Sequence, residues 1–379
     1  MKHLLNILDL STEEIDELIA VAEDIDAHPE KYEEACRHKI LATLFFEPST
    51  RTRLSFETAM LSLGGNVVSV AGANTSSAAK GESVADTAAA VSGYADVIAM
   101  RHPKEGAPYV AANHSSVPVI NAGDGGHYHP TQTLADLLTV HREKGAFENL
   151  TVGFCGDLKY GRTVHSLIAA LSRYRGVKFV LISPEELRLP EFVKRDYIEE
   201  KGIPYVESAS LEEQIGTLDA LYMTRVQKER FESEEEYDRL KDTYILTEEK
   251  MRLAGKNTIV LHPLPRVNEI SARVDDDPRA CYFKQTRNGK LMRMALILKL
   301  LKENAGARGN SGGYARGETG KTAPTNGAEN GRETFESALV KCVNPHCIFS
   351  CEQELPPLFY RDKRGTVCCA YCDAAAEKA

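Results

Sequence analysis

The chain has 379 residues, of which 42% are hydrophobic and 27% are charged, and this length suits two or three domains with sizeable cores. The formal net charge of −9 argues against general binding of nucleic acid or of an acidic membrane surface, so any anion site has to be local. The sequence shows no signal-peptide pattern and no membrane span. We therefore expect a cytoplasmic protein whose cysteines are reduced.

The first 300 residues alternate short β-branched runs with amphipathic helical patterns, beginning with a helix over residues 11–24 that Ser11 and Glu14 would cap. This alternation predicts parallel sheets covered by helices on both faces. The predicted strands are residues 40–46, 95–101, 117–123, 150–157, 177–183, 218–224 and 257–263. One compact sheet would not hold so many strands, so we expect an α/β fold with two doubly wound parallel-sheet domains joined by helices.

Helical patterns cover residues 52–63, 130–144, 162–175 and 291–304. The helix at 130–144 would begin with proline at its first position and bridge the two domains. The expected domains are residues 1–145, with a helix over 288–303 packing back on it, and residues 146–287. A glycine-rich stretch, 304–333, predicts a flexible linker before a cysteine-rich segment, 334–379.

Polar side chains follow the predicted strands where parallel α/β sheets bind ligands, at the carboxyl ends. The first strand leads into PSTRTR (48–53), where hydroxyls and arginines meet a helix start and predict an anion site. Arginines follow three further strands, and His129 and Gln132 flank the helix start at Pro130. Because the arginine fork binds phosphate and carboxylate bidentately, we expect a site for a phosphate and at least one carboxylate.

Six motifs then carry a family resemblance in chain order over residues 3–303: PSTRTRLSFE, MRHPKEG, NAGDG followed by HPTQTLADL, GDLKYGRTVHSL, YMTRVQKER and VLHPLPRVNEI. Together they resemble aspartate carbamoyltransferase catalytic chains. The STRT and HPTQ elements are similar to those of ornithine carbamoyltransferases as well, whereas RVQKER and HPLPR are those of the aspartate enzymes. The resemblance implies transfer of the carbamoyl group from carbamoyl phosphate to L-aspartate, an early step of pyrimidine biosynthesis, without a catalytic metal.

The resemblance also implies a role for individual residues. Those that would bind carbamoyl phosphate are Ser49, Thr50, Arg51, Thr52, Ser76, Lys80, Arg101, His129, Gln132, Leu264 and Pro265. Of these, the catalytic set is Arg51, Thr52, Lys80, Arg101, His129 and Gln132. Those that would bind aspartate are Lys80, Arg162, Thr163, Arg225 and Gln227.

The segment 73–83 resembles the mobile loop with which a neighbouring subunit completes the active site in this family. Ser76 and Lys80 would then act in the adjoining subunit, which implies a homotrimer or a multiple of it. Some relatives carry two adjacent lysines here, whereas this chain has Ala79 before Lys80, so the charge of the loop rests on Lys80 alone.

Six of the nine cysteines fall between Cys342 and Cys372. A Cys-x4-Cys pair followed by a Cys-x2-Cys pair has the spacing of a structural zinc site, with Cys351 and Cys368 as alternative ligands and disulfides as the competing explanation. The segment resembles the zinc domain of the aspartate carbamoyltransferase regulatory chain, which selects Cys342, Cys347, Cys369 and Cys372. No predicted catalytic residue lies in this tail, so a role in assembly, by docking on a catalytic domain, is expected.

Three other functions compete with this interpretation. The chain could be a catalytically silent scaffold, or a carbamoyltransferase for another amino acid. The tail could also be a nucleic-acid-binding zinc ribbon, but it lacks a basic, aromatic face. Every matched position holds the residue that the chemistry needs, which favours the active enzyme. Because of the negative net charge, neither nucleic acid nor a membrane is an expected partner.

Overall fold

The structure is a computed structural model that describes residues 2–73, 77–226, 233, 235, 239–240, 243–305, 332–352 and 355–379. It divides into two compact units. The first unit comprises Met1–Thr131 and Lys290–Ala379, and the second comprises Gln132–Gly289. Two helices, α5 (Pro130–Lys144) and α11 (Tyr282–Glu303), each run from one unit into the other.

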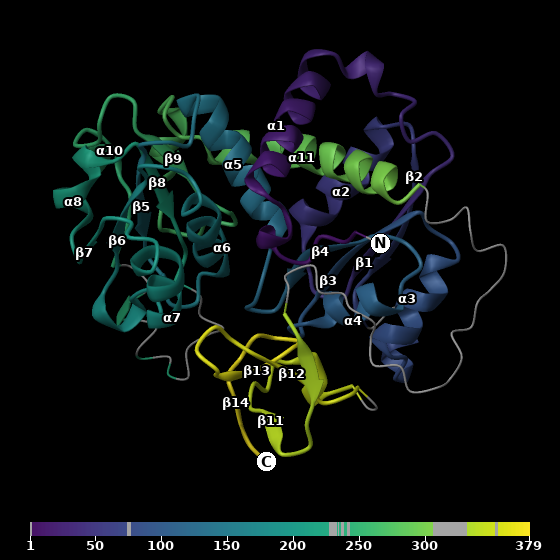
Figure 1. Cartoon of the computed structure of the whole chain (residues 1–379). Helices are drawn as coiled ribbons and strands as arrows, with labels where there is room; N and C mark the ends of the chain where they lie inside the picture. The colour runs from purple at the N-terminus through teal and green to yellow at the C-terminus, as the bar shows by residue number, and fades with distance from the viewer. Residues whose placement is uncertain are drawn as a thin grey trace. The chain divides into compact units, whose positions relative to one another are not determined.

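The first unit contains a parallel four-stranded sheet with the order β2-β1-β3-β4. Its strands are β1 (Ile40–Phe45), β2 (Asn66–Ala71), β3 (Val97–His102) and β4 (Val119–Asp124). The helices of this unit are α1 (Thr12–Ala27), α2 (Thr50–Ser62), α3 (Val84–Ser92) and α4 (Ala107–His114). Ala42, Leu44, Ile98 and Met100 pack in one core with residues of α3 and α4, and Figure 1 shows α1 and α2 on the other side of the sheet.

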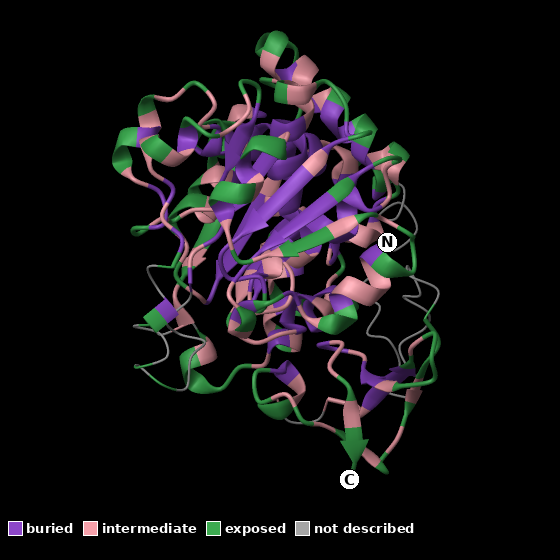
Figure 2. Ribbon diagram, turned by 90° about the vertical axis from the view of Figure 1, so that its left-hand side faces the viewer, coloured by how far each residue is buried: buried purple, intermediate pink, exposed green. Residues whose placement is uncertain are grey.

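The second unit contains a parallel five-stranded sheet with the order β7-β6-β5-β8-β9. Its strands are β5 (Thr151–Cys155), β6 (Lys178–Ile182), β7 (Tyr205–Ser208), β8 (Ala220–Met223) and β9 (Ile259–Leu261). Its helices besides α5 and α11 are α6 (Arg162–Leu171), α7 (Glu191–Lys194), α8 (Leu211–Gln214) and α10 (Glu248–Met251). Strands β5, β6, β8 and β9 are almost entirely buried, as the purple ribbons of Figure 2 show.

All seven predicted strands are present within a few residues of their predicted ends, and the α/β class with two parallel sheets is confirmed. The capping box of α1 is also confirmed, because Ser11 accepts from the Glu14 backbone and Glu14 accepts from the Ser11 backbone. Strands β2 and β7 were not predicted. Both lie at a sheet edge and contain no buried residue, so neither has the buried apolar run that marks the predicted strands.

Helix α11 begins six residues before the expected helix over 288–303 and nine residues before the helical pattern at 291–304. Its first half carries the buried polar residues Gln285 and Asn288 in place of an apolar stripe. Gln285 donates to Asp136, and Asn288 donates to Thr139 of α5. Hydrogen bonds therefore replace hydrophobic burial along this face, and a pattern of apolar residues does not reveal it.

The tail, residues 332–379, packs within the first unit. It forms an antiparallel sheet of β10 (Thr334–Glu336), β12 (Leu358–Arg361) and β13 (Val367–Cys369), and a ribbon of β11 (Val340–Cys342) and β14 (Ala376–Lys378). Ile348, Phe359 and Tyr371 share a core with α4. Gly106 before α4 has a φ of 84°, and a Cβ there would lie 2.5 Å from the Tyr371 carbonyl oxygen. The tail therefore docks closely on its own chain.

None of the described helices combines the length and the apolar character needed to cross a membrane.

Candidate active site

Each sheet has one point at which its strand order reverses. In the first unit the chain goes from β1 outward to β2 and then returns to β3 on the other side, so the reversal lies between β1 and β3. In the second unit it lies between β5 and β8. Such switch points open a crevice at the carboxyl ends of the strands and are the usual ligand sites of doubly wound sheets. The predicted residues follow these strands in both units.

In the first unit, the residues after β1 meet the end of β3. Phe45 pairs with Arg101 in the parallel register, and two residues later Glu47 forms an ion pair with the Arg101 guanidinium at 2.8 Å. Ser49 is the N-cap residue of α2, but its side chain makes no capping hydrogen bond. Capping therefore does not account for the hydroxyl residues at this helix start.

Two guanidinium groups approach each other at this switch point. Burial lowers the pKa of Arg51, and the nearby positive charge of Arg101 lowers it further. Burial also lowers the pKa of Arg101, against the opposing effect of Glu47. Two cations that repel each other beside a helix start form an electropositive site, and an anion bound there would relieve the repulsion.

His129 follows the loop after β4, directly before α5, and is buried. Its Nδ1 atom lies 3.5 Å from the Thr131 hydroxyl. The same hydroxyl accepts a hydrogen bond from Arg293 at 3.1 Å, and Arg293 also donates to Ser55 of α2 at 3.0 Å. Arg293, itself buried, thus ties the start of α5 to α2, a role that no local sequence pattern indicates.

Of the two residues predicted in the 73–83 loop, Lys80 is among the described residues and Ser76 is not. Lys80 is exposed at the end of a short 3₁₀ helix, Ser77–Lys80. Ser76 lies outside the described residues.

In the second unit, Arg162 and Thr163 begin α6 after β5, and Arg225 follows β8. Strands β5 and β8 are neighbours, so these residues lie on either side of the switch point. Gln227 lies outside the described residues. Two arginines on adjacent strand ends have the charge and the forked geometry that a dicarboxylate requires.

A buried hydrogen-bond network connects Gln132 with Thr163. Gln132 Nε2 donates to Asp136 at 2.8 Å, and Tyr222 donates to the other oxygen of Asp136 at 3.0 Å. The Tyr222 hydroxyl also interacts with the Thr163 side chain. Burial, followed by the charge of Asp136, raises the pKa of Tyr222 well above its ordinary value. The network holds the Gln132 side chain through its amide nitrogen.

Asp136 lies four residues after Gln132 in α5, so the two share a helix face, and this spacing could have predicted their contact. Tyr222 gave no comparable signal, because it reads as one more apolar position of a buried strand.

Leu264 and Pro265 follow β9 and are oriented by His262. The Leu264 amide donates to His262 Nδ1 at 2.8 Å, and His262 Nε2 lies 2.7 Å from Glu269. Burial would raise the pKa of Glu269, but the His262 contact and the Val267 amide lower it overall. The buried His262 side chain therefore links the Leu264 backbone to Glu269. Leu264 and Pro265 are the residues after β9 that the family resemblance assigns to the substrate site.

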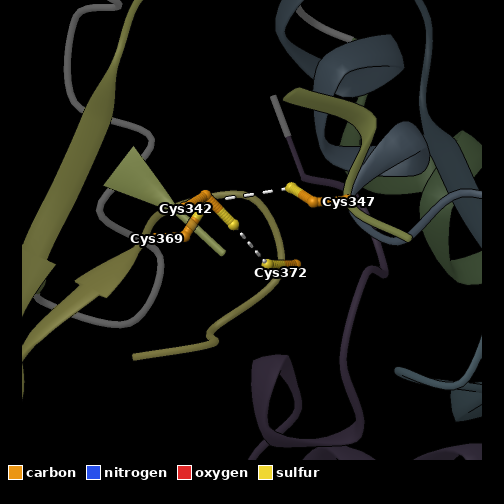
Figure 3. A group of neighbouring side chains, drawn as sticks. All are labelled: Cys342, Cys347, Cys369 and Cys372. Carbon is orange, nitrogen blue, oxygen red and sulfur yellow. Dashed lines mark hydrogen bonds between the residues drawn. The ribbon is translucent and has the colours of Figure 1, made fainter. Parts of the chain in front are cut away.

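The four predicted zinc ligands form one cluster. Their sulfur atoms all lie within 4.8 Å of one another, and Figure 3 shows the side chains converging from β11, β13 and two turns. Cys342 and Cys372 are 3.6 Å apart, and Cys347 and Cys369 are 3.8 Å apart. A tetrahedral site with Zn–S bonds of about 2.3 Å requires S···S distances of about 3.8 Å. The cluster therefore fits a zinc ion.

The two alternative ligands do not join this cluster. The Cys351 thiol contacts the carbonyl oxygens of Cys347 and Ile348, and the Cys368 thiol contacts that of Thr366. All nine cysteines are free, so the disulfide explanation has no support in the structure.

Comparisons with known proteins agree with these observations. A family model described as the aspartate/ornithine carbamoyltransferase carbamoyl-P binding domain matches residues 2–142, and the Asp/Orn binding domain model matches residues 148–300. The aspartate carbamoyltransferase catalytic subunit of Clostridium novyi is 62% identical over 300 residues, which covers 79% of this chain and 98% of that protein. The corresponding subunit of Lachnoclostridium phytofermentans is 61% identical, with the same coverage.

Solved structures give the same result. The catalytic subunit of the M. jannaschii aspartate transcarbamoylase is 49% identical, with a TM-score of 0.76 over 81% of this chain and 100% of that chain. The Trypanosoma cruzi aspartate transcarbamoylase, solved in complex with carbamoyl phosphate and aspartate, is 38% identical, with a TM-score of 0.75 over 79% of this chain and 96% of that chain. Both family models match regions that end by residue 300, before the cysteine-rich tail. The chain belongs to the aspartate/ornithine carbamoyltransferase family, among the aspartate carbamoyltransferase catalytic subunits.

Proposed function

We propose that this chain transfers the carbamoyl group of carbamoyl phosphate to the α-amine of L-aspartate, releasing N-carbamoyl-L-aspartate and phosphate. The observation that carries the proposal is the placement of paired arginines at the switch points of both sheets, Arg51 with Arg101 and Arg162 with Arg225. One pair suits a phosphate and the other a dicarboxylate. The experiment that tests it compares L-aspartate with L-ornithine as carbamoyl acceptors.

The phosphate of carbamoyl phosphate would bind at the start of α2, to Ser49, Thr50, Arg51 and Thr52. The exposed backbone N–H groups and the positive end of the helix dipole favour an anion there. The repulsion between Arg51 and Arg101 supports the assignment, because bound phosphate would neutralise it. Lys80 and Ser76 would add contacts from a neighbouring subunit.

The carbonyl oxygen of the substrate would lie near Thr52, Arg101 and His129. Attack by the amine turns this oxygen into an oxyanion, and preformed donors that stabilise the developing charge lower the barrier. The Glu47 ion pair holds the Arg101 guanidinium in place, and the Thr131 contact does the same for His129. Thus the donors are oriented before substrate arrives.

The carbamoyl NH₂ group would be recognised by Gln132, together with the Leu264 and Pro265 carbonyl oxygens. Gln132 Nε2 donates to Asp136, so the amide oxygen of Gln132 is the atom that would accept a hydrogen bond from the carbamoyl NH₂ group. If the amide were flipped, the NH₂ group of Gln132 would face the NH₂ group of the substrate, and two donors cannot form a hydrogen bond. Asp136 therefore selects the useful orientation.

The two carboxylates of aspartate would bind to Arg162, Arg225 and Gln227, with Thr163 and Lys80 in support. A proton must leave the attacking amine, and the departing phosphate is its acceptor. No side chain forms a covalent intermediate in this scheme. The rate enhancement comes from positioning the two substrates and from electrostatic stabilisation of the oxyanion.

The assembly proposed here is a homotrimer, or a multiple of it, whose active sites are shared through the loop that carries Ser76 and Lys80. We also propose a cytoplasmic location, which the nine free cysteines support. The four-cysteine cluster would hold a structural Zn²⁺, since a segment of this size builds only a small core without a staple.

We expect reduced, purified protein to contain one zinc ion per chain. Cys342→Ser should lose most of this zinc and leave the tail open to proteolysis, because binding of the metal and folding of the tail are coupled. Cys351→Ser is the matched control, since its exposed thiol contacts only neighbouring carbonyl oxygens. Elemental analysis with limited proteolysis measures both effects. Equal zinc contents in the two variants would contradict the assignment of ligands.

A further inference from the structure

One carboxylate of the tail joins it to the loop that carries His129. The Oδ2 atom of Asp373 accepts from the Tyr128 hydroxyl at 2.9 Å and lies 3.3 Å from His127 Nε2. Its Oδ1 atom accepts from Arg332 at 2.7 Å and from Tyr360 at 2.9 Å, both in the tail. One oxygen of Asp373 thus contacts the loop and the other contacts the tail, so the carboxylate connects the two segments.

The tail holds Asp373 rigidly. It follows Cys372 of the cysteine cluster, and its amide donates to the Cys369 carbonyl oxygen at 3.0 Å. Its φ of 58° lies in the left-handed region, which asparagine and aspartate tolerate better than most residues. The position of this carboxylate therefore depends on the turn between two of the clustered cysteines.

In the loop before His129, a carboxylate contacts each of the two ring nitrogens of His127. His127 Nδ1 lies 3.1 Å from the buried carboxylate of Asp124, which also accepts from the Gly106 and Tyr128 amides. With a carboxylate at each nitrogen, the imidazole is charged: the pKa of His127 rises to about 10, because Asp124 and Asp373 outweigh the lowering by burial. The imidazolium ring is fixed between β4 and the tail.

A second bridge supports the same loop. Glu105 accepts from the Gly126 amide at 3.1 Å with one oxygen and from the Asn344 side chain of the tail at 2.6 Å with the other. Its backbone exchanges hydrogen bonds with His346 and Ile348. The tail therefore contacts the loop 125–128 directly and through Glu105, immediately before His129.

We infer that Asp373 is a positioning residue for His129: the tail uses this carboxylate to fix His127 and Tyr128, and thereby sets the position of the imidazole that acts on the substrate carbonyl. The inference rests on the proposed role of His129. It assigns the tail a part in the chemistry of its own chain, in addition to any part in assembly. Small displacements of a catalytic group lower kcat more than they lower substrate affinity.

Asp373→Asn tests the inference, because asparagine keeps the size and tolerates the backbone conformation but loses the charge and one acceptor. We expect kcat to fall about ten-fold to a hundred-fold, with the KM values for both substrates changed less than about two-fold. Zinc content and the thermal midpoint should match those of the wild type. The control is Asp362→Asn, the same substitution in an exposed turn of the tail, where the side chain accepts only from nearby backbone amides.

A double-mutant cycle separates positioning from a merely structural effect. If Asp373 acts through His127, the losses in kcat from Asp373→Asn and His127→Gln should fall well short of adding. Additive losses, or an Asp373→Asn enzyme that keeps its zinc and has the kcat of Asp362→Asn, would overturn the inference.

Should Asp373→Asn lose zinc, Tyr128→Phe and His127→Gln decide the question from the loop side without altering the tail. We expect both to keep zinc and to lower kcat, and wild-type kcat in both would overturn the inference. A wild-type chain that forms no carbamoyl-aspartate would instead mean that the proposed function is wrong.

Discussion

Arg101→Ala should lower kcat about 10²–10³-fold, the cost of removing one donor to a developing oxyanion. The guanidinium is held at the end of β3 by Glu47, and in the proposed mechanism its charge would act most strongly on the carbonyl oxygen as the tetrahedral state forms. The KM for aspartate should change much less. Arg225→Ala should do the reverse, raising the KM for aspartate strongly, because its positive charge binds the ground-state carboxylate as well. Steady-state kinetics with each substrate in turn measures this division.

Removing Arg101 also leaves the Glu47 carboxylate without its partner, which could itself reduce activity. The double variant Arg101→Ala with Glu47→Gln removes that unpaired charge, and its kcat should remain low. Arg37→Ala, which removes an exposed arginine paired with Glu34, is the surface control. The division of roles is wrong if Arg101→Ala has a normal kcat, or if Glu47→Gln restores it.

Shared active sites predict recovery of activity from two inactive parents. Lys80→Ala and Arg51→Ala chains should each be nearly inactive alone. After joint unfolding and reassembly in equal amounts, half of the clefts have Arg51 and half of the neighbouring loops have Lys80, so about a quarter of the sites should be intact. Specific activity of the mixture, measured against wild-type protein reassembled in the same way, gives the result.

Mixing the same two variants without unfolding is the control, because trimers that do not exchange subunits should gain nothing. A reassembled mixture that remains as inactive as its parents would mean that Lys80 acts within its own subunit or does not act at all. The exposed position of Lys80 at the end of the Ser77–Lys80 turn makes it accessible to another subunit.

The inner strands were predictable because each is a short, buried, β-branched run followed by a polar cluster, such as PSTRT after β1. The predicted substrate-binding residues of both units could be placed at strand ends for the same reason. The switch points then follow from the strand order. Strands β2 and β7 and the first half of α11 lack a buried apolar run, and their places depend on neighbours that are distant in sequence.

The contacts that orient the predicted residues were harder to foresee. Arg293 holds Thr131 from 162 positions away in the chain, and Asp373 reaches His127 from 246 positions away. An aspartate beside a cysteine, or an arginine within an apolar helix, carries no local signal of its partner. The tail was therefore predicted to serve assembly alone, because the contact between Asp373 and the loop before His129 exists only in the folded chain.

Carbamoyl transfer to L-aspartate can be tested by measuring kcat/KM for L-aspartate and L-ornithine with carbamoyl phosphate. Phosphate release is followed, and the product is identified by mass spectrometry. Arg162 and Arg225 favour two carboxylates, whereas the side-chain ammonium of ornithine would face uncompensated positive charge. We predict N-carbamoyl-L-aspartate and phosphate in equal amounts, and no comparable turnover of ornithine. Similar kcat/KM values for the two amino acids, or turnover of neither, would show that the chain is not an aspartate-specific carbamoyltransferase.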